Sequence, residues 1–310
     1  MTKVKATAVE EGADSARDPH VAAARFCAEA GSLYVVATPL GNLRDVTLRA
    51  LDVLASADMI AAEDTRTSAI LLRHYGILTR PVALHAHNED QKLHAVAEWL
   101  RAGRSVALIS DAGTPAISDP GARLVQAVRA AGFPVVPIPG PSAVIAAVSA
   151  AGLDAASFVF VGFLPAQAKA RRSLLEHLAV HAGALVFYEA PHRVVATIAD
   201  LADVLGGDRD LVIAREITKK FESIVRLPLA GAAAWIAAEP QRQRGEFVLI
   251  VDSPVAATMP EGATMAPEQV RWLQALLDEL PPARAARVVA AVTGLSRDDV
   301  YTRALAMKRR

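Results

Sequence analysis

Short apolar runs alternate with amphipathic segments along the chain from Gly31 onward. The runs are rich in β-branched residues, and the segments between them carry apolar residues at helical spacing. Strand alternating with helix predicts a parallel sheet with helical crossovers and both faces covered. The strands expected in this first half are Ser32–Thr38, Asp58–Asp64, Pro81–His87, Ser105–Asp111 and Val135–Pro139.

The second half has the same kinds of element in a different arrangement. Its apolar runs are SFVFVGFL, GALVFYEA, DLVIARE, ESIVRLPL and GEFVLIVD. Clear helical segments separate only the first three runs, so this sheet is expected to be mixed, or antiparallel at one side. A change of pattern near 153–157 marks the boundary between two α/β domains.

After Asp252 the chain becomes a Pro/Ala/Thr-rich linker and then three helical segments. Ser296, with Asp299 three residues on, resembles a helix-capping box. The pattern predicts a small tail of the helix-turn-helix type, with a dimerising or merely stabilising cap as the alternative. The expected parts are a flexible extension (1–30), an α/β domain (31–153), a second α/β domain (154–252), a linker (253–268) and the tail (269–310).

Composition narrows the function classes. The 310 residues carry no formal net charge, so the protein as a whole has no positive field that would attract nucleic acid. The last forty residues are nevertheless basic, with eight Lys/Arg against four Asp/Glu. Cys27 is the only cysteine, so no internal disulfide or cysteine-based metal site is expected. With no signal peptide and no apolar run of ~18 residues, we expect a cytoplasmic protein without membrane contact.

The ends of the predicted strands carry the candidate chemistry. Four of the first five strands run into ATPLGNLRD, AEDTRTS, SDAGTPAISDPG and PIPGPSA, which combine turn residues with hydroxyls or carboxylates. Ligands of parallel α/β sheets bind at the carboxyl ends of the strands, so these loops predict a binding cleft. The chain lacks the P-loop and G-x-G-x-x-G motifs, and His85 with His87 has no third metal ligand nearby, so no metal is expected.

Six blocks in one order carry a resemblance to a known family. VVATPLGNLRDVTLRALDVL, AAEDTRTS, ISDAGTPAISDPG, PIPGPSAVIAAVSAAGL, FVFVGFLP and AREITKKFE resemble the tetrapyrrole-methylase-like (class III) S-adenosylmethionine methyltransferases. More narrowly, they resemble the bacterial 16S rRNA cytidine 2′-O-ribose methyltransferases, whose C-terminal module the tail also resembles. The fold implied is a two-domain tetrapyrrole-methylase-like α/β fold with a parallel-sheet N-terminal domain, a mixed-sheet C-terminal domain and a small helical tail.

The resemblance implies that S-adenosylmethionine binds between the two domains. Turn-forming or helix-capping roles are the alternative for Asp111. The positions of this chain that match the family's cofactor contacts are Pro39, Leu40, Asp111, Thr114, Ser142, Ala143, Tyr188, Glu189, Ile217, Gly245 and Glu246.

A ribose hydroxyl is a poor nucleophile when neutral, so the implied reaction calls for a base or an orienting acceptor. A surface set of ion pairs is the alternative for the charged candidates. On a strand, Glu63 and Asp64 point to opposite faces, so at most one of them enters a given pocket. The candidates are Glu63, Asp64 and Arg66 in the second loop, and Glu216, Lys219 and Glu222 in REITKKFE.

The resemblance also implies partners: 16S rRNA in the small ribosomal subunit, and a second copy of the chain in a homodimer. Basic residues of the second domain are candidates for phosphate contact, with solvated surface charge as the alternative. They are Lys169, Arg171, Arg172 and Arg193. Two other functions stay open, a methyltransferase for a tetrapyrrole precursor and a non-catalytic RNA-binding module on the same fold.

Overall fold

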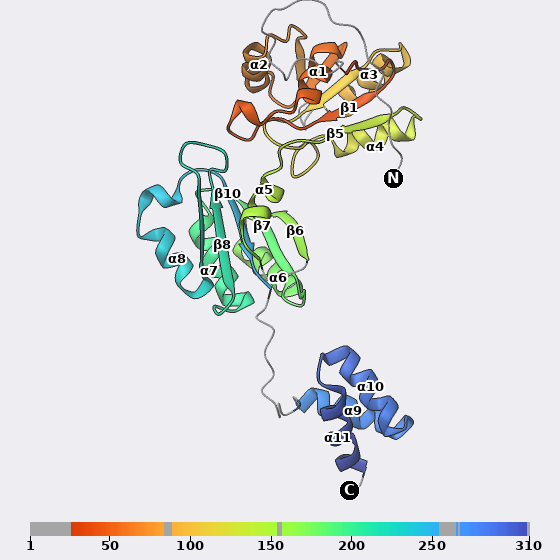
Figure 1. Cartoon of the computed structure of the whole chain (residues 1–310), viewed down its shortest axis with the longest axis vertical. Coiled ribbons are helices and arrows are strands. Elements are labelled where there is room, and N and C mark those ends of the chain that lie inside the picture. Colours follow the sequence, from red (N-terminus) through yellow and green to blue (C-terminus); the bar gives the residue numbers. More distant parts are fainter. Residues whose placement is uncertain (1–25, 84–88, 154–156, 254–264, 266, 309–310) are drawn as a thin grey trace, which may run out of the picture.

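The computed structural model describes residues 26–83, 89–153, 157–253, 265 and 267–308 (Figure 1). His85 and His87 lie outside these residues, as do most of the predicted N-terminal extension and linker. The backbone N–H groups of Phe26 and Ala28 donate to Asp52 and Ser56 of the first domain. The last residues of the predicted extension are therefore docked on that domain, because they find hydrogen-bond acceptors on its first helix.

The first domain contains a parallel sheet, as the strand–helix alternation predicted. Its spatial order is β3-β2-β4-β1-β5, and every neighbouring pair is parallel. The strands β1, β2, β4 and β5 end earlier than expected, because the residues that follow have left the sheet for the loops. The strands are β1 (Leu33–Val36), β2 (Met59–Ala62), β3 (Pro81–Ala83), β4 (Val106–Ile109) and β5 (Val135–Ile138).

Helices cover both faces of this sheet. One face packs around Tyr34, Leu54 and Ile60, and the other around Leu33, Leu108 and Leu124, all almost fully buried. Such two-sided burial explains why the strands read as continuous apolar runs. The helices of this part are the short 3₁₀ helix η2 (Leu43–Asp45), α1 (Leu48–Ser56), α2 (Thr65–His74), α3 (Glu89–Arg101), α4 (Ala122–Ala130) and α5 (Ala143–Ala150).

The second domain is built on a mixed sheet, which confirms the sequence expectation. Its order is β6-β7-β10-β8-β9; β6 and β7 run parallel, and the other neighbouring pairs are antiparallel. The strands are β6 (Phe158–Phe163), β7 (Ala184–Glu189), β8 (Asp210–Arg215), β9 (Ser223–Pro228) and β10 (Phe247–Val251). The helices are α6 (Ala168–Leu178), α7 (Val194–Leu205), α8 (Leu229–Ala237) and the 3₁₀ helix η4 (Pro240–Gln243).

Helix α5 connects the two domains physically as well as in sequence. Its residues Val144 and Ala147 are buried against Val186, Val212 and Val248 of the second sheet. The other face of that sheet carries α6, α7 and α8 around Phe187. The sequence places α5 at the end of the first domain, but its small apolar side chains cover the second sheet. The amino end of α5 consequently lies where the domains meet.

The tail is a compact unit of three helices, α9 (Pro267–Glu279), α10 (Pro282–Thr293) and α11 (Arg297–Lys308). Leu273, Val289 and Val300 lie in its core and are almost fully buried. The Asp299 N–H donates to Ser296 Oγ at 3.5 Å, which is one half of the predicted capping box. In the described part of the chain, no helix combines the length and apolar character needed to cross a membrane.

Candidate cofactor cleft between the domains

Backbone contacts join the strand-end loops of the first domain into one rigid shelf. The N–H groups of Thr38 and Gly113 donate to each other's carbonyl oxygens at 2.8 and 2.9 Å, which pairs the loops after β1 and β4. The Thr114 hydroxyl donates to the Pro141 carbonyl at 2.9 Å and ties in the loop after β5. Asp64, after β2, donates its N–H to Asp111 at 3.0 Å. Loops far apart in sequence therefore form one surface.

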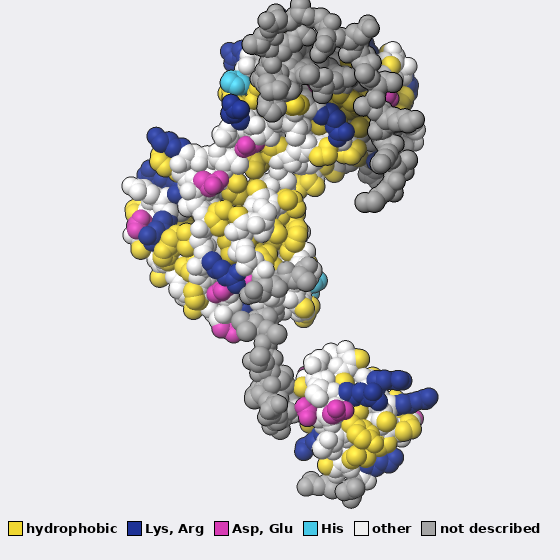
Figure 2. Space-filling view, in the orientation of Figure 1, with side chains coloured by type: hydrophobic (Ala, Val, Ile, Leu, Met, Phe, Trp, Pro, Cys, Tyr) yellow, Lys and Arg dark blue, Asp and Glu magenta, His cyan; other side chains and the backbone are white. Residues whose placement is uncertain are grey.

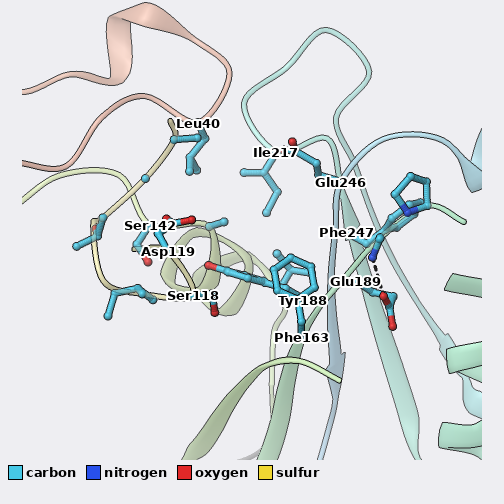
Figure 3. A pocket seen from close by; sticks show the side chains of 18 residues that line it. Leu40, Ser118, Asp119, Ser142, Phe163, Tyr188, Glu189, Ile217, Glu246 and Phe247 are labelled. Carbon is cyan, nitrogen blue, oxygen red and sulfur yellow. Dashed lines mark hydrogen bonds between the residues drawn. The ribbon is translucent and has the colours of Figure 1, made fainter. Parts of the chain in front are cut away.

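This shelf and the second sheet enclose a cavity of about 290 Å³, the main cavity (Figure 3). Side chains from both domains point into it, among them Leu40 from the first and Tyr188 from the second. The N-cap residue of α5, Ser142, makes no side-chain capping bond, and the backbone N–H of Val144 in the first turn hydrogen-bonds to Tyr188 at the cavity wall. The lining residues are Leu40, Ala112, Gly113, Thr114, Ile117, Ser118, Asp119, Ser142, Ala143, Phe163, Tyr188, Glu189, Ala190, Pro191, Ile217, Glu246, Phe247 and Val248.

The structure brings most of the sequence-predicted cofactor residues together at this cavity. Pro39 and Asp111 line a second, neighbouring cavity instead. Gly245 lines neither; it has a left-handed φ of +94°, and a Cβ there would lie 2.5 Å from the Glu216 side chain. The predicted residues that line the main cavity are Leu40, Thr114, Ser142, Ala143, Tyr188, Glu189, Ile217 and Glu246.

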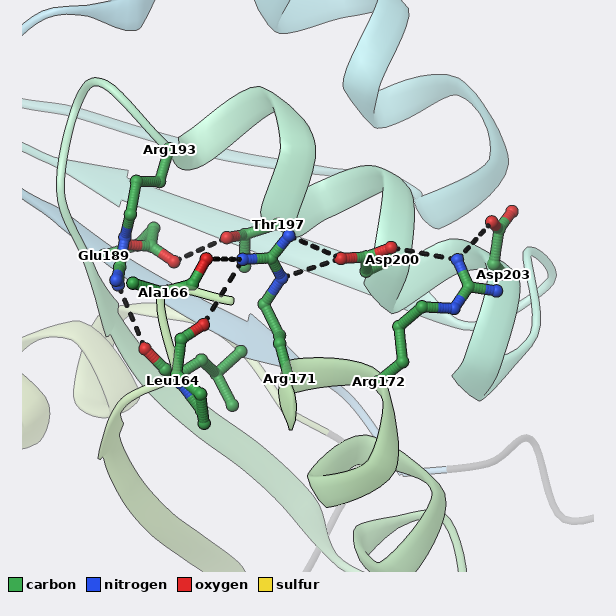
Figure 4. A network of polar contacts seen from close by, with 10 residues as sticks. Leu164, Ala166, Arg171, Arg172, Glu189, Arg193, Thr197, Asp200 and Asp203 are labelled. Atoms are coloured by element: carbon green, nitrogen blue, oxygen red, sulfur yellow. Dashed lines mark hydrogen bonds and ion pairs between the residues drawn. The ribbon is translucent and has the colours of Figure 1, made fainter. Parts of the chain in front are cut away.

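Glu189 lines the main cavity, but its carboxylate is engaged by hydrogen bonds within the second domain. Its carboxylate accepts hydrogen bonds from Arg193 at 2.6 and 2.8 Å and from the Thr197 hydroxyl at 2.6 Å (Figure 4). The residue is only 2% exposed. The carboxylate therefore has a structural role beneath the wall, and contact of Glu189 with a cofactor stays a prediction.

One of the predicted RNA contacts, Arg171, is contradicted by its burial, and another, Arg193, is engaged within the second domain. Arg171 is 4% exposed, and its guanidinium binds Asp200 at 2.6 and 2.7 Å and two backbone carbonyls (Figure 4). Arg193 is held by Glu189 and the Leu164 carbonyl. Both guanidiniums are engaged inside the second domain, because buried carboxylates there require a partner.

Arg172 and Lys169 are the other two basic candidates in this region. Arg172, whose side chain is 42% exposed, bridges Asp200 and Asp203 at 2.9 and 3.0 Å. Lys169 is exposed at the start of α6. Their contact with RNA stays a prediction.

The charged loop after β2 is organised as a helix cap. Asp64 is the N-cap of α2 and accepts from the Arg66 N–H and guanidinium, each at 2.8 Å. These hydrogen bonds lower the pKa of Asp64 to about 2. Arg66 has 90% of its side chain exposed and closes the pair. Asp64 is thus a weak base. The charge of its neighbour Glu63 acts on Asp119 in the main cavity, whose pKa it helps to raise.

The β8–β9 loop (residues 216–222) forms the other charged group. Lys219 Nζ bridges Glu216 and Glu246 at 3.0 and 2.9 Å. Burial alone would lower the pKa of Lys219, but the Glu246 and Glu216 carboxylates outweigh it and raise that pKa. Glu222 accepts from the Thr218 N–H at 2.5 Å, which fixes the loop. A Cβ on Gly41 would lie 2.2 Å from Lys219 Cγ, so the loop touches the first domain here.

Asp119 is a site residue that the sequence reasoning missed. It lines the main cavity, and burial, followed by the charge of Glu63, raises its pKa to about 6; Asp111 adds a smaller effect. The signal was present, since Asp119 stands in the quoted SDPG turn. Its approach to two other carboxylates, however, depends on the packing of the loops after β2 and β4.

Burial also raises the pKa of Tyr188, the aromatic residue at the centre of the cavity. Its phenol therefore stays neutral at physiological pH. Tyr188 packs edge-on against Phe160 and Phe163, at ring-centroid distances of 4.9 and 5.6 Å. Among the residues described, no group of three or more His, Cys, Asp or Glu side chains is placed to hold a metal ion.

The sequence and the architecture match a known family. The model of the Tetrapyrrole (Corrin/Porphyrin) Methylases matches residues 32–233, and that of the RsmI C-terminal HTH domain matches residues 263–308. The Vibrio cholerae protein named Ribosomal RNA small subunit methyltransferase I is 50% identical over 270 residues, which cover 87% of this chain and 92% of that one. The chain belongs to this methyltransferase family.

Other relatives agree with this membership in the ribosomal RNA small subunit methyltransferase I family. The Pseudomonas aeruginosa protein of that name is 49% identical over 277 residues, which cover 89% of this chain and 97% of the relative. Among solved structures, the cobalt precorrin-4 methyltransferase CbiF superposes with a TM-score of 0.55 at 16% identity, over 71% of this chain and 95% of its own. The methyltransferase CobJ superposes with a TM-score of 0.55 at 23% identity, over 72% of this chain and 95% of its own. At these identities the solved structures show the fold alone.

Proposed function

We propose that the protein uses S-adenosylmethionine to methylate the ribose 2′-hydroxyl of a cytidine in 16S rRNA. One observation carries the proposal: residues matched from both domains line one cavity where the domains meet. The names of the relatives, at 49 and 50% identity, supply the RNA class. Ribose 2′-O chemistry and cytidine come from the resemblance of the sequence blocks.

The chemistry of the main cavity fits this cofactor. Tyr188, Ile217 and Leu40 offer aromatic and aliphatic walls for a purine ring. The amino end of α5, which has no side-chain cap, suits a carboxylate because the helix dipole favours an anion there. Ser118 offers a hydroxyl for the polar groups of the cofactor.

Such a cofactor, when bound, would supply a methyl group: the sulfonium S–C bond breaks with its electrons staying on sulfur as a C–O bond forms. The chain's own task is to hold the two substrates in line and to accept the hydroxyl proton. Asp119 is better suited to that proton than Asp64. A base works best when its pKa lies near the operating pH, and these pKa values are about 6 and about 2.

The exposed cations provide the proposed contact with RNA. Arg284, Arg287 and Arg303 are exposed on the tail, where Figure 2 shows Lys and Arg side chains on several sides. Phosphate contacts of this kind supply affinity, and the cleft would supply the choice of nucleotide. A homodimer, and a place in the cytoplasm where ribosomal subunits assemble, belong to the same proposal.

The test is methyl transfer from labelled S-adenosylmethionine to small ribosomal subunits, or to their RNA, from cells that lack this enzyme. We expect one labelled cytidine whose 3′ linkage resists alkaline cleavage, because a 2′-O-methyl group removes the attacking hydroxyl. Label on a base, or no label on subunits or RNA, contradicts the proposal. A parallel reaction with a tetrapyrrole precursor should remain unlabelled.

Calorimetry with S-adenosylmethionine tests the cleft separately from activity. Ile217→Ala should weaken binding by about three- to tenfold, since it removes apolar contact area from the wall. Ile224→Ala is the matched control, because Ile224 lies on the partly exposed strand β9 outside both cavities. Equal affinities of the two variants would count against the cleft as the cofactor site.

A further inference from the structure

A second cavity, of about 190 Å³, adjoins the main cavity on the first domain. It lies between the loop after β1, the start of α2 and the end of β4. Leu40 lines both cavities, so one side chain forms part of the wall between them. The lining residues are Thr38, Pro39, Leu40, Gly41, Leu43, Thr67, Ser68, Ile70, Leu71, Ile109, Ser110 and Asp111.

We propose that this second cavity receives the ribose of the RNA nucleotide that becomes methylated. The inference rests on the proposed function and deepens it, because it assigns the acceptor substrate to a site of its own. A transfer between two substrates needs reacting atoms within ~3–3.5 Å of each other. The two cavities meet at Leu40, so a ribose in the second cavity would lie next to a methyl donor in the main cavity.

The polar groups of the second cavity suit a sugar. Ser68 is 4% exposed, and its Oγ has no hydrogen-bond partner among the described residues. Buried hydroxyls are normally paired, so an orphaned one in a cavity wall points to a ligand that completes it. Thr67 and the Asp111 carboxylate stand beside it as further donor and acceptor.

The apolar residues and the size of the cavity select the same occupant. Ile70, which is 57% exposed, and Leu43 offer an apolar rim on which a base can rest. The volume, about 190 Å³, is smaller than the 290 Å³ of the main cavity, to which the larger cofactor is assigned. One sugar ring suits this space, whereas a tetrapyrrole macrocycle exceeds it.

The wall between the cavities is stiff, which a positioning role requires. The paired backbone bonds between Thr38 and Gly113 hold the loop after β1 at its base. The Thr38 hydroxyl also donates to the Ser110 carbonyl at 3.1 Å. Pro39 further restricts the turn. An acceptor held by these loops would keep a fixed position relative to a donor in the adjoining main cavity.

Thr67→Phe tests the assignment by filling the second cavity from its exposed rim, where a larger side chain spares the core. We expect the KM for 16S rRNA to rise at least tenfold, while the Kd for S-adenosylmethionine, measured by calorimetry, stays within twofold. The target nucleotide's 2′-hydroxyl, protected from acylating reagents by wild-type protein, should become reactive again. Ser149→Phe is the control, since it adds the same ring at an exposed position outside both cavities.

Ser68→Ala provides a second variant, which removes only the orphaned hydroxyl and leaves the fold intact. It should raise the KM for RNA by about three- to tenfold, the usual effect of one lost hydrogen bond. Weaker S-adenosylmethionine binding in Thr67→Phe would assign the second cavity to the methyl donor and overturn the inference. Unchanged KM and unchanged protection in both variants would overturn it as well. Absence of methyl transfer by the wild-type protein would instead defeat the proposed function, and this inference with it.

Discussion

Among the single residues, Asp119 has the most unusual environment. Desolvation and the neighbouring Glu63 and Asp111 carboxylates disfavour its charged form, which is why its pKa rises to about 6. A hydrogen bond with Ser110 opposes this rise without cancelling it. The protonation of Asp119, in the wall of the main cavity, therefore changes near physiological pH.

Asp119 should make the stability of the protein depend on pH. The folded state binds its proton more tightly than the unfolded chain, whose pKa is near 3.8. This contribution is fully present below about pH 4 and is lost as the pH rises through 6. We expect a loss of about 1 kcal/mol between pH 4.5 and 7.5, after allowance for solvent screening, that Asp119→Asn abolishes.

Urea denaturation of both proteins at the two pH values measures this difference. Asp298→Asn, at an exposed position of the tail, is the control and should leave the wild-type profile unchanged. An Asp119→Asn profile parallel to that of the wild type would show that Asp119 titrates normally.

Arg171 illustrates how burial changes the meaning of a basic residue. Arg171→Met should lower the free energy of unfolding by about 3 kcal/mol, because it leaves Asp200 without its main partner in a buried site. The KM for RNA should stay within twofold. Lys169→Ala should do the reverse. Its free energy of unfolding should stay within about 0.5 kcal/mol of the wild-type value, while the KM for RNA should rise. Weaker RNA binding by a fully stable Arg171→Met would restore Arg171 as an RNA contact.

At the scale of elements, the β8–β9 loop and the loop after β1 meet at Lys219 and Gly41. Gly41 leaves just enough room for the Lys219 side chain, which passes over it to reach Glu216 and Glu246. Each ion pair alone contributes little, since the pairs are partly exposed. Their position gives them significance, because they hold the second-domain loop beside the wall of the main cavity.

Gly41→Ala should displace Lys219 and weaken S-adenosylmethionine binding by about three- to tenfold, while the free energy of unfolding changes by less than 1 kcal/mol. In a Lys219→Ala background the same change should have no further effect, because the clashing atoms are gone. Calorimetry on the four proteins gives the coupling directly. Gly231→Ala, where a Cβ meets nothing within 4 Å, is the control. Additive effects in the double variant would show that the two loops act independently.

At the scale of the whole molecule, the tail adds charge without altering the cleft. Replacing Arg284, Arg287 and Arg303 with Gln should weaken RNA binding. It should also reduce the slope of log Kd against log salt concentration by about 2 to 3, one counterion or slightly less for each lost phosphate contact. The Kd for S-adenosylmethionine should not change. Glu268→Gln with Asp278→Asn is the control, and an unchanged salt slope would favour a packing role for the tail.

The fold was largely predictable from the sequence, whereas the site was predictable only in outline. The loops after β1, β4 and β5 were readable as a binding edge, because turn residues and strand ends are local signals. Arg171 was misassigned as an RNA contact, since a charge in a sequence does not reveal whether a partner buries it. Asp119 was missed for the same reason, as Glu63, the charged neighbour with the larger effect on its pKa, comes from another loop.

The sequence alone determined the order of helices and strands, the parallel and mixed character of the two sheets, and the polar strand ends. These follow from hydrophobic periodicity and turn chemistry, which act over a few residues. The tertiary structure decided that α5 covers the second sheet, which carboxylates share an environment, and that two cavities share the wall at Leu40. These features depend on distances between residues far apart in the chain, and such distances are set only when the cores pack.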